Sequence, residues 1–143
     1  MDHTRSGDDL FVRLDPGEEV HASLRDLADE VGFDAAAITS GIGRTRDHVI
    51  GWMGDDGVYH RFEMPEAMEL VTMQGLLARM EDGSAFTHIH ITVGDEKVGA
   101  HAGHLFEATV HVVVEAHLRI LPEAYMMRCP VEDSSFIRLD LRP

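Results

Sequence analysis

The sequence contains very little cysteine and very little lysine. Its 143 residues include one cysteine, Cys129, and one lysine, Lys97. A single cysteine forms no disulfide within the chain, and it excludes a zinc site built on several cysteines. The basic residues number 12, so 11 are arginines, and 26 acidic residues outnumber them.

Long apolar runs and basic runs are also missing. No stretch approaches the roughly 20 apolar residues that span a bilayer. The opening segment MDHTRSGDDL lacks the apolar stretch of a signal peptide. We therefore expect a cytoplasmic protein with no membrane partner. Nucleic-acid phosphates are bound by clustered Lys and Arg, and the densest basic spot is the pair Arg44 and Arg46. The charge therefore does not favour direct DNA binding.

The acidic residues are spread along the whole chain and give a formal net charge of −14. A dispersed acidic excess with almost no lysine resembles the surface of proteins from salt-accumulating halophiles. At molar salt the Debye length is about 3 Å, so repulsion among these charges is largely screened. The composition therefore predicts an acidic, halophile-like surface suited to a high-salt cytoplasm.

Common catalytic motifs are absent as well. The chain has no Ser-His-Asp spacing, no phosphate-binding glycine loop and no G-x-G-x-x-G after a strand. The sequence identifies neither a substrate nor a catalytic residue. It therefore favours a protein that is not an enzyme but leaves the question open.

One amphipathic helix is predicted over residues 16–31. Asp15 suits the N-cap, Pro16 the first helical position and Glu18 the third. Gly32 follows as a stop. Apolar side chains recur at helical spacing at Val20, Leu24, Leu27 and Val31.

The rest of the chain is typical of β-structure. Apolar and polar residues alternate over short segments that are separated by brief turns, and Gly75 within one segment indicates a bulge or a close backbone approach. These segments cover residues 9–15, 35–54, 57–64, 68–80, 85–94, 108–121, 124–129 and 134–141. One helix and about eight strands predict a single α+β domain over residues 1–143, with a mostly antiparallel twisted sheet and a flexible tail at 1–7.

Histidines gather in the stretch THIHITVGDEKVGAHAGHL, which holds four of the ten histidines in the chain. Residues two apart in a strand share a face and are about 6.6 Å apart. His88 and His90 therefore lie side by side, and Ile89 and Ile91 face the core. A metal bound at about 2.0–2.1 Å from each nitrogen can bridge such a pair. The alternative interpretation is an ordinary polar strand face.

A third imidazole can come from the segment that follows. Gly94 and Gly99 allow the chain to turn back, and an antiparallel return brings either His104 or His101 beside the pair. Three imidazoles leave an open fourth position, as in catalytic zinc sites. Neutral imidazole also suits nickel, cobalt, copper and iron, so the ligand type predicts a divalent transition metal without naming it.

The remaining polar candidates are weaker. His111 and His117 share a strand face with Glu115, and they are interpreted either as groups supporting the ligands or as a polar or subunit-facing strip. Glu107 and Glu115 are the carboxylates nearest in sequence to the histidine-rich stretch, but their spacing does not show that they reach a metal. Four further histidines are predicted to be solvated: His3, His21, His48 and His60.

Four segments in order resemble the PPC domain, the plants and prokaryotes conserved domain. They are TSGIG, HRFEMPEAMELVTMQGLLA, THIHITVGD and AGHLFEATVHVVVEAHLRIL. The resemblance covers roughly residues 8–142. It implies a small α+β domain built around an antiparallel sheet and assembled as a homotrimer. It also implies that His88, His90 and the histidine of the G-H-L motif, His104, bind a metal, usually zinc, and that His101 is a neighbour.

The same resemblance carries a second functional hypothesis. In plant relatives the domain follows an AT-hook, a short Arg-Gly-Arg-Pro element that binds DNA, and mediates assembly with partner proteins. No such element occurs in this sequence. The principal expectation is therefore a trimeric metal-binding protein of undefined biochemical role. The alternative is a DNA-associated or transcription-related regulator that acts through partners or by direct DNA binding, for which Arg44, Arg46 and Arg61 are the only candidates.

Overall fold

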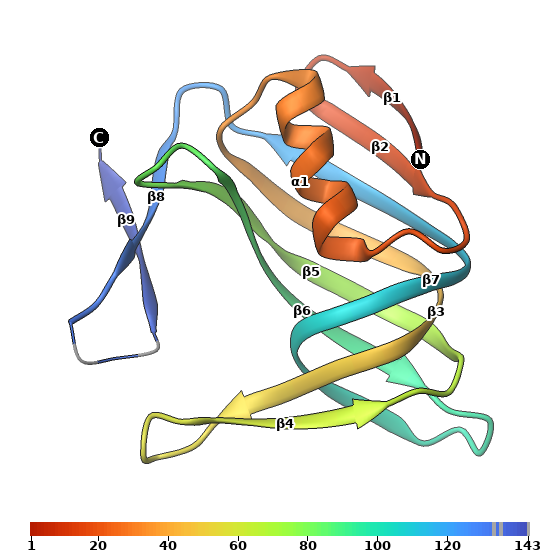
Figure 1. Ribbon diagram of the computed structural model, residues 1–143. Coiled ribbons are helices and arrows are strands. Elements are labelled where there is room, and N and C mark those ends of the chain that lie inside the picture. Colours follow the sequence, from red (N-terminus) through yellow and green to blue (C-terminus); the bar gives the residue numbers. More distant parts are fainter. Residues whose placement is uncertain (133, 135, 143) are drawn as a thin grey trace.

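The structure is a computed structural model that describes residues 1–132, 134 and 136–142 (Figure 1). Its elements in chain order are β1 (Asp2–Ser6), β2 (Asp9–Leu14), α1 (Val20–Val31), β3 (Ala36–Met53), β4 (Tyr59–Met64), β5 (Met68–Met80), β6 (Ala85–Gly94), β7 (Ala100–Ile120), β8 (Tyr125–Pro130) and β9 (Ile137–Arg142). Over these described residues, no helix has the length and apolar character needed to cross a bilayer.

All the strands belong to one sheet. The order is β1-β2-β7-β3-β5-β8-β9, with β4 paired to β3 and β6 paired to both β5 and β7. Every pairing is antiparallel except that between β5 and β8. The prediction of one helix with a mostly antiparallel sheet is therefore confirmed. Residues 1–7 were expected to be a flexible tail, but Asp2–Ser6 instead pair with β2 along their whole length.

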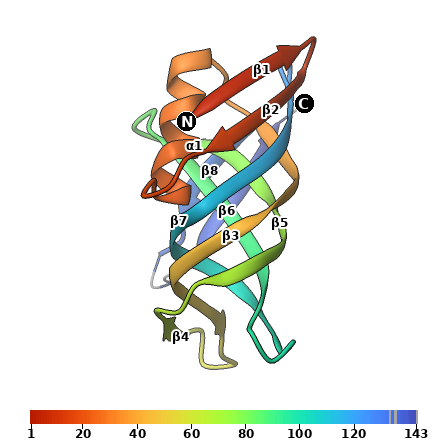
Figure 2. The same ribbon diagram turned by 90° about the vertical axis from the view of Figure 1, so that its right-hand side faces the viewer.

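The sheet curls until it meets itself. Strands β7, β3, β5 and β6 form a closed circuit of pairings, because β6 pairs with β5 on one side and with β7 on the other. Helix α1 lies towards one end of the curled sheet, and the β4 hairpin lies at the opposite end (Figures 1 and 2). The core between helix and sheet includes Leu24, Leu27 and Ile89, all fully buried.

The helix begins four residues later than predicted. Its N-cap is Glu19, whose carboxylate accepts a hydrogen bond from the Ala22 amide at 2.7 Å. The predicted capping residues form a turn instead, in which the Glu18 carboxylate accepts from the Asp15 amide at 2.6 Å. Gly17 in this turn has a φ of 91°, which a right-handed helix does not accommodate. The predicted end at Gly32 is confirmed.

Strand β6 alternates as predicted. Ile89, Ile91 and Val93 are buried, while His88 and His90 lie on the other face. Strand β7 departs from alternation at two places, between the buried residues Leu105 and Ala108 and again at Val112. Val112 is 53% exposed, although simple alternation with the buried Val110 and Val114 would place it on the core side. The reason is a register shift against β3, where Arg44 pairs with Val113 but Thr45 pairs with Val110, so two β7 residues are left between these pairs.

Candidate metal centre

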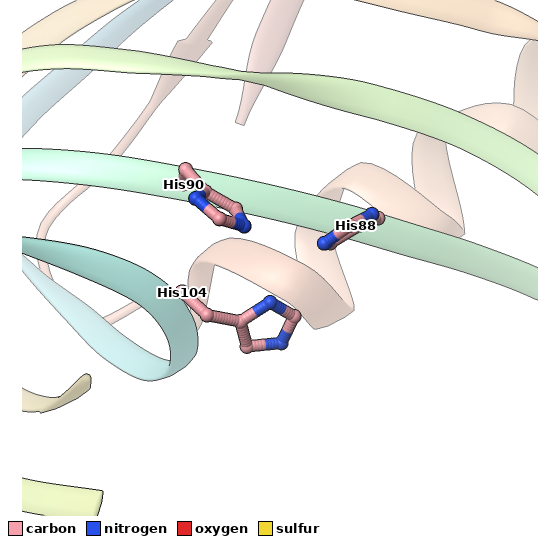
Figure 3. A group of neighbouring side chains, drawn as sticks. All are labelled: His88, His90 and His104. Atoms are coloured by element: carbon pink, nitrogen blue, oxygen red, sulfur yellow. The ribbon is translucent and has the colours of Figure 1, made fainter. Parts of the chain in front are cut away.

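Three histidines converge on the exposed face of the curled sheet. His88 and His90 come from β6, and His104 comes from β7, where it lies directly opposite His90 in the antiparallel ladder. Their ring centroids are 4.9 to 5.3 Å apart. One nitrogen of each ring faces the space between the three rings (Figure 3). We refer to these three residues as the histidine cluster.

The turn before β7 sets this register. The Asp95 carboxylate accepts hydrogen bonds from the amides of Lys97 and Gly99, at 2.9 and 2.8 Å. These bonds hold a tight connection between β6 and β7, so the two strands return beside each other in register. On the other side of β6, Gly75 of β5 lies against the His88 carbonyl. An added Cβ at Gly75 would be 2.0 Å from that oxygen, which confirms the predicted close backbone approach.

The separations in the histidine cluster suit a metal after small side-chain rotations. One candidate ligand atom from each ring lies within 4.8 Å of the others. Tetrahedral zinc with bonds of about 2.0–2.1 Å places its nitrogen ligands about 3.3 Å apart. The candidate ligand atoms are therefore at most about 1.5 Å farther apart than zinc requires.

The electrostatic environment keeps two members of the cluster neutral. Burial, with smaller contributions from neighbouring cationic groups, lowers the pKa of His88 and of His104 to about 4. Both rings are therefore unprotonated at neutral pH, which is the state that binds metals. The buried Nδ1 of His104 has no hydrogen-bond partner among the described residues. An unpaired buried polar atom costs about 1–3 kcal/mol, so a ligand for this nitrogen would remove a real penalty.

Two arginines and two aromatic rings border the cluster. The Arg128 guanidinium of β8 donates to the His88 Nδ1 at 2.9 Å. The rings of Tyr59 and Phe106 pack against His104, with centroids 5.1 and 4.6 Å away. Arg61 lies over the Phe106 ring at 3.9 Å. Sequence reasoning did not find Arg128 or Tyr59 as neighbours of the site, because only the folded sheet brings β8 and β4 to the histidine-rich strands.

His21 supports the cluster from inside the protein. It was predicted to be solvated, and this was wrong, because only 7% of it is exposed. Its Nδ1 lies 2.7 Å from the Thr87 hydroxyl, and its Nε2 lies 3.1 Å from the Leu105 carbonyl oxygen. Thr87 precedes His88 and Leu105 follows His104, so His21 connects α1 to both strands that carry the histidine cluster. Burial lowers its pKa. The sequence contained one signal for this burial, because His21 lies beside the apolar stripe of the helix.

His48 is also buried rather than solvated, with 1% exposure. Its Nε2 lies 2.8 Å from the Thr45 hydroxyl, and its Nδ1 lies 3.3 Å from the Met64 carbonyl oxygen. Burial lowers its pKa, with smaller opposing effects from the Met64 carbonyl and from Asp47. This histidine joins β3 to the end of β4 and takes no part in the histidine cluster.

The other sequence candidates lie outside the cluster. The Nε2 of His101 lies within hydrogen-bond distance of the Asp95 carboxylate, at 3.0 Å. His117 lies 2.6 Å from the Thr39 hydroxyl and 3.1 Å from the Asp9 carboxylate, so its contacts are with β3 and β2 rather than with the ligands. Among the described residues the cluster contains three histidines and no carboxylate, and neither Glu107 nor Glu115 belongs to it.

The arginines considered for DNA binding are engaged with acidic or aromatic neighbours. Arg44 pairs with Glu69 at 3.1 Å, and Arg46 pairs with Asp47. Arg61 covers the Phe106 ring. The carboxylates of Glu69 and Asp47 therefore offset the charges of Arg44 and Arg46, the densest basic spot in the sequence.

The fold and the cluster have counterparts in known proteins. A plant- and prokaryote-conserved (PPC) protein from Pyrococcus horikoshii is 26% identical, with a TM-score of 0.81 over 92% of this chain and 88% of that one. A metal-containing protein from Archaeoglobus fulgidus is 27% identical, with a TM-score of 0.80 over 94% of both chains. A proposed DNA-binding protein from Bacteroides thetaiotaomicron is 24% identical, with a TM-score of 0.88 over 97% and 96%.

Curated proteins contain no match to this chain. The family comparison is nevertheless decisive. Residues 1–122 match the family model of the Plants and Prokaryotes Conserved (PCC) domain, and this range includes both strands of the histidine cluster and most of the curled sheet. This chain therefore belongs to the PCC domain family.

Proposed function

We propose that this protein is a metal-binding member of the PCC family in which His88, His90 and His104 hold one divalent transition metal, zinc or a close relative. The observation that carries the proposal is the His104 Nδ1, a buried nitrogen without a partner. It faces two other imidazoles at bonding reach after small rotations. A polar strand face without a ligand does not account for that nitrogen, because buried polar atoms in proteins are normally paired.

The donor set also fits the metal. Three neutral imidazoles are typical ligands of zinc and leave a fourth position free. A bound zinc would supply Lewis acidity there and would lower the pKa of a bound water. The structural relative from Archaeoglobus fulgidus is a metal-containing protein, which agrees with this assignment. We assign no reaction to the site, because no carboxylate of the described residues stands in the cluster to act as a base.

We further propose that the protein is a homotrimer that uses the outer face of β2, β3 and β7. Phe11, Ile42 and Val112 on this face are more than half exposed. Two adjoining surface hollows share Ile42, one lined also by Phe11 and the other by Val112. A contiguous apolar surface of this kind is typical of a subunit contact. Light scattering should give three times 15.9 kDa, and Ile42→Asp should give monomers.

The alternative is a DNA-associated regulator. Structural relatives from Bacteroides thetaiotaomicron and Ralstonia eutropha are proposed DNA-binding proteins, although at 24% and 21% identity they share only the fold with this chain. A mobility-shift assay of the wild type beside Arg44→Ala/Arg46→Ala separates the two functions. Absence of a shift at every salt concentration removes direct DNA binding by this chain.

Elemental mass spectrometry of untagged protein tests the metal proposal. The wild type should carry close to one transition-metal ion per chain, and His88→Ala/His90→Ala should carry almost none. His101→Ala is the matched control, because this histidine comes from the same stretch but lies outside the cluster, and it should retain the metal. Wild-type protein that stays metal-free after incubation with zinc would refute the proposal.

A further inference from the structure

Arg128 is unusual among the arginines of this protein. It alone among them is buried, with 4% exposure. Its Nη1 donates to the Ile137 carbonyl oxygen and its Nη2 to the His88 Nδ1, both at 2.9 Å. Its Nε is buried and has no hydrogen-bond partner among the described residues. The guanidinium therefore has unused donor capacity beside the histidine cluster.

The charge of Arg128 is also uncompensated. Within the described part of the chain, no carboxylate forms an ion pair with it, although the chain has 26 acidic residues. Arg79 lies on the neighbouring strand β5, next to the residue that pairs with Arg128, and it forms ion pairs with both Asp29 and Asp34. A buried charge without a partner is strongly unfavourable, so such groups are normally paired. The missing partner of Arg128 is therefore an anion that the described residues do not supply.

The position of Arg128 limits what that anion can be. The guanidinium touches His88, so the missing anion lies next to the space between the three imidazoles. Strand β4 also places Tyr59 against His104 and Arg61 over Phe106. The β4 and β8–β9 hairpins project on the same side of the molecule, on the left in Figure 1. A second arginine near the cluster adds to the positive potential in an otherwise acidic protein.

We propose that Arg128 and the metal held by His88, His90 and His104 together form a binding site for a small oxyanion, a carboxylate or a phosphate. The inference rests on the proposed metal function, because the anion uses the open coordination position. Such groups present two or more oxygens, so one molecule can satisfy the metal and the guanidinium at once. The planar fork of arginine matches carboxylate and phosphate geometry, and these charge-assisted bonds are among the stronger hydrogen bonds in proteins.

Cobalt-loaded full-length protein provides the test. The visible absorption of bound Co²⁺ reports a change in its fourth ligand, and sodium acetate and sodium phosphate serve as the two probe anions. Each should change the wild-type spectrum in a saturable way, and the relative affinities distinguish carboxylate from phosphate. Arg128→Gln removes the charge but keeps an amide that can donate to the Ile137 carbonyl. It should raise the dissociation constant of the preferred anion by about ten- to hundredfold, with cobalt content unchanged.

The controls separate the two proposals. Arg119→Gln removes an exposed arginine that pairs with Asp8 and Asp9 far from the cluster, and anion binding should stay as in the wild type. If the wild type holds cobalt but neither anion changes its spectrum, or if Arg128→Gln binds as well as the wild type, the oxyanion inference is wrong and the metal function stands. If the wild type holds no cobalt, both proposals fail, and the elemental content shows this directly.

If Arg128→Gln does not fold, a crystal structure of the wild type provides a second test. Crystals of the wild type grown with zinc and acetate should show the acetate within hydrogen-bond distance of the Arg128 guanidinium. Acetate on the metal but away from Arg128, or water in its place at saturating acetate, would overturn the inference.

Discussion

Two sets of histidines in this protein differ in their partners, the pair His21 and His48 and the histidine cluster. His21 and His48 are buried, and in each both ring nitrogens lie within hydrogen-bond distance of a protein oxygen. In the histidine cluster, by contrast, the buried His104 Nδ1 has no partner, and an arginine donates to His88. Burial lowers the pKa of His21 and His48, and it also lowers the pKa of His88 and His104.

The comparison shows that burial alone does not identify a functional histidine. Desolvation makes an imidazole neutral wherever it is buried. The difference lies in the ring nitrogens. In His21 and His48 the protein uses both nitrogens to join elements, whereas in the cluster the buried His104 Nδ1 has no partner among the described residues and is available to a ligand. Unsatisfied buried polar atoms reduce stability, and natural proteins retain them mainly where function requires them.

The largest effect is expected on zinc affinity, from a substitution that removes one proposed ligand and keeps the packing around it. His104→Phe keeps a ring against Tyr59 and Phe106 but removes one of three ligands. Zinc affinity by calorimetry should fall by more than the roughly 10–100-fold that is typical of losing a supporting group. The metal-free variant should be as stable as the wild type or more stable, because the unpaired nitrogen is gone. Zinc binding equal to that of the wild type would contradict the ligand assignment.

The second largest effect is expected on stability, from the removal of His21. His21→Ala leaves the Thr87 hydroxyl and the Leu105 carbonyl without their partner in the interior. The free energy of unfolding should fall by about 2–3 kcal/mol, as measured by urea denaturation of metal-free protein. His111→Ala, at an exposed position of β7, should change it by less than about 0.5 kcal/mol. Equal effects of the two substitutions would mean that His21 does not join the helix to the sheet.

The third effect is the pH dependence that both groups share. Four histidines have a pKa in the folded protein that is lower than the ordinary value of 6.5. They are His21, His48, His88 and His104. The unfolded chain therefore binds protons more readily between pH 6.5 and the folded pKa, and acidification favours unfolding. The stability of metal-free protein should be greatest above pH 6.5 and should fall between pH 6.5 and 5. A urea midpoint that is constant or rises over this interval would contradict the burial of these rings.

The smallest effect is expected from the surface. With 26 acidic and 12 basic residues, repulsion should weaken as salt screens it. The thermal midpoint should be higher at ~2 M KCl than at ~0.1 M, by a few degrees. A higher midpoint at low salt would count against the halophile-like interpretation. Measuring zinc affinity at the same two salt concentrations shows whether the histidine cluster responds to salt. We expect little change in zinc affinity, because His88 and His104 are partly buried.

Much of the fold was predictable from local patterns. Alternation in 85–94 placed Ile89 and Ile91 in the core and His88 and His90 outside, because a strand has a strict period of two. The pattern failed at Val112, where a register shift against β3 breaks alternation that no local signal reveals. It also failed at residues 15–18, where a turn with positive φ at Gly17 uses the residues typical of a helix cap.

The cluster was predictable in part. The His-x-His spacing and the antiparallel return narrowed the third ligand candidate to His101 or His104, and the ladder places His104 opposite His90. Arg128 and His21 were not predictable as neighbours of the site. Arg128 lies 40 residues from His88 and His21 lies 66 residues from Thr87. Such contacts depend on how the whole sheet curls and on where the helix packs against it.

The most direct test of the central claim is a crystal structure of zinc-loaded protein with anomalous scattering recorded at the zinc edge. The account predicts one strong anomalous peak per chain, about 2.0–2.1 Å from one nitrogen each of His88, His90 and His104, with the His104 Nδ1 among them. A peak bound elsewhere, or no peak while the His104 Nδ1 takes an ordinary hydrogen bond, would contradict it.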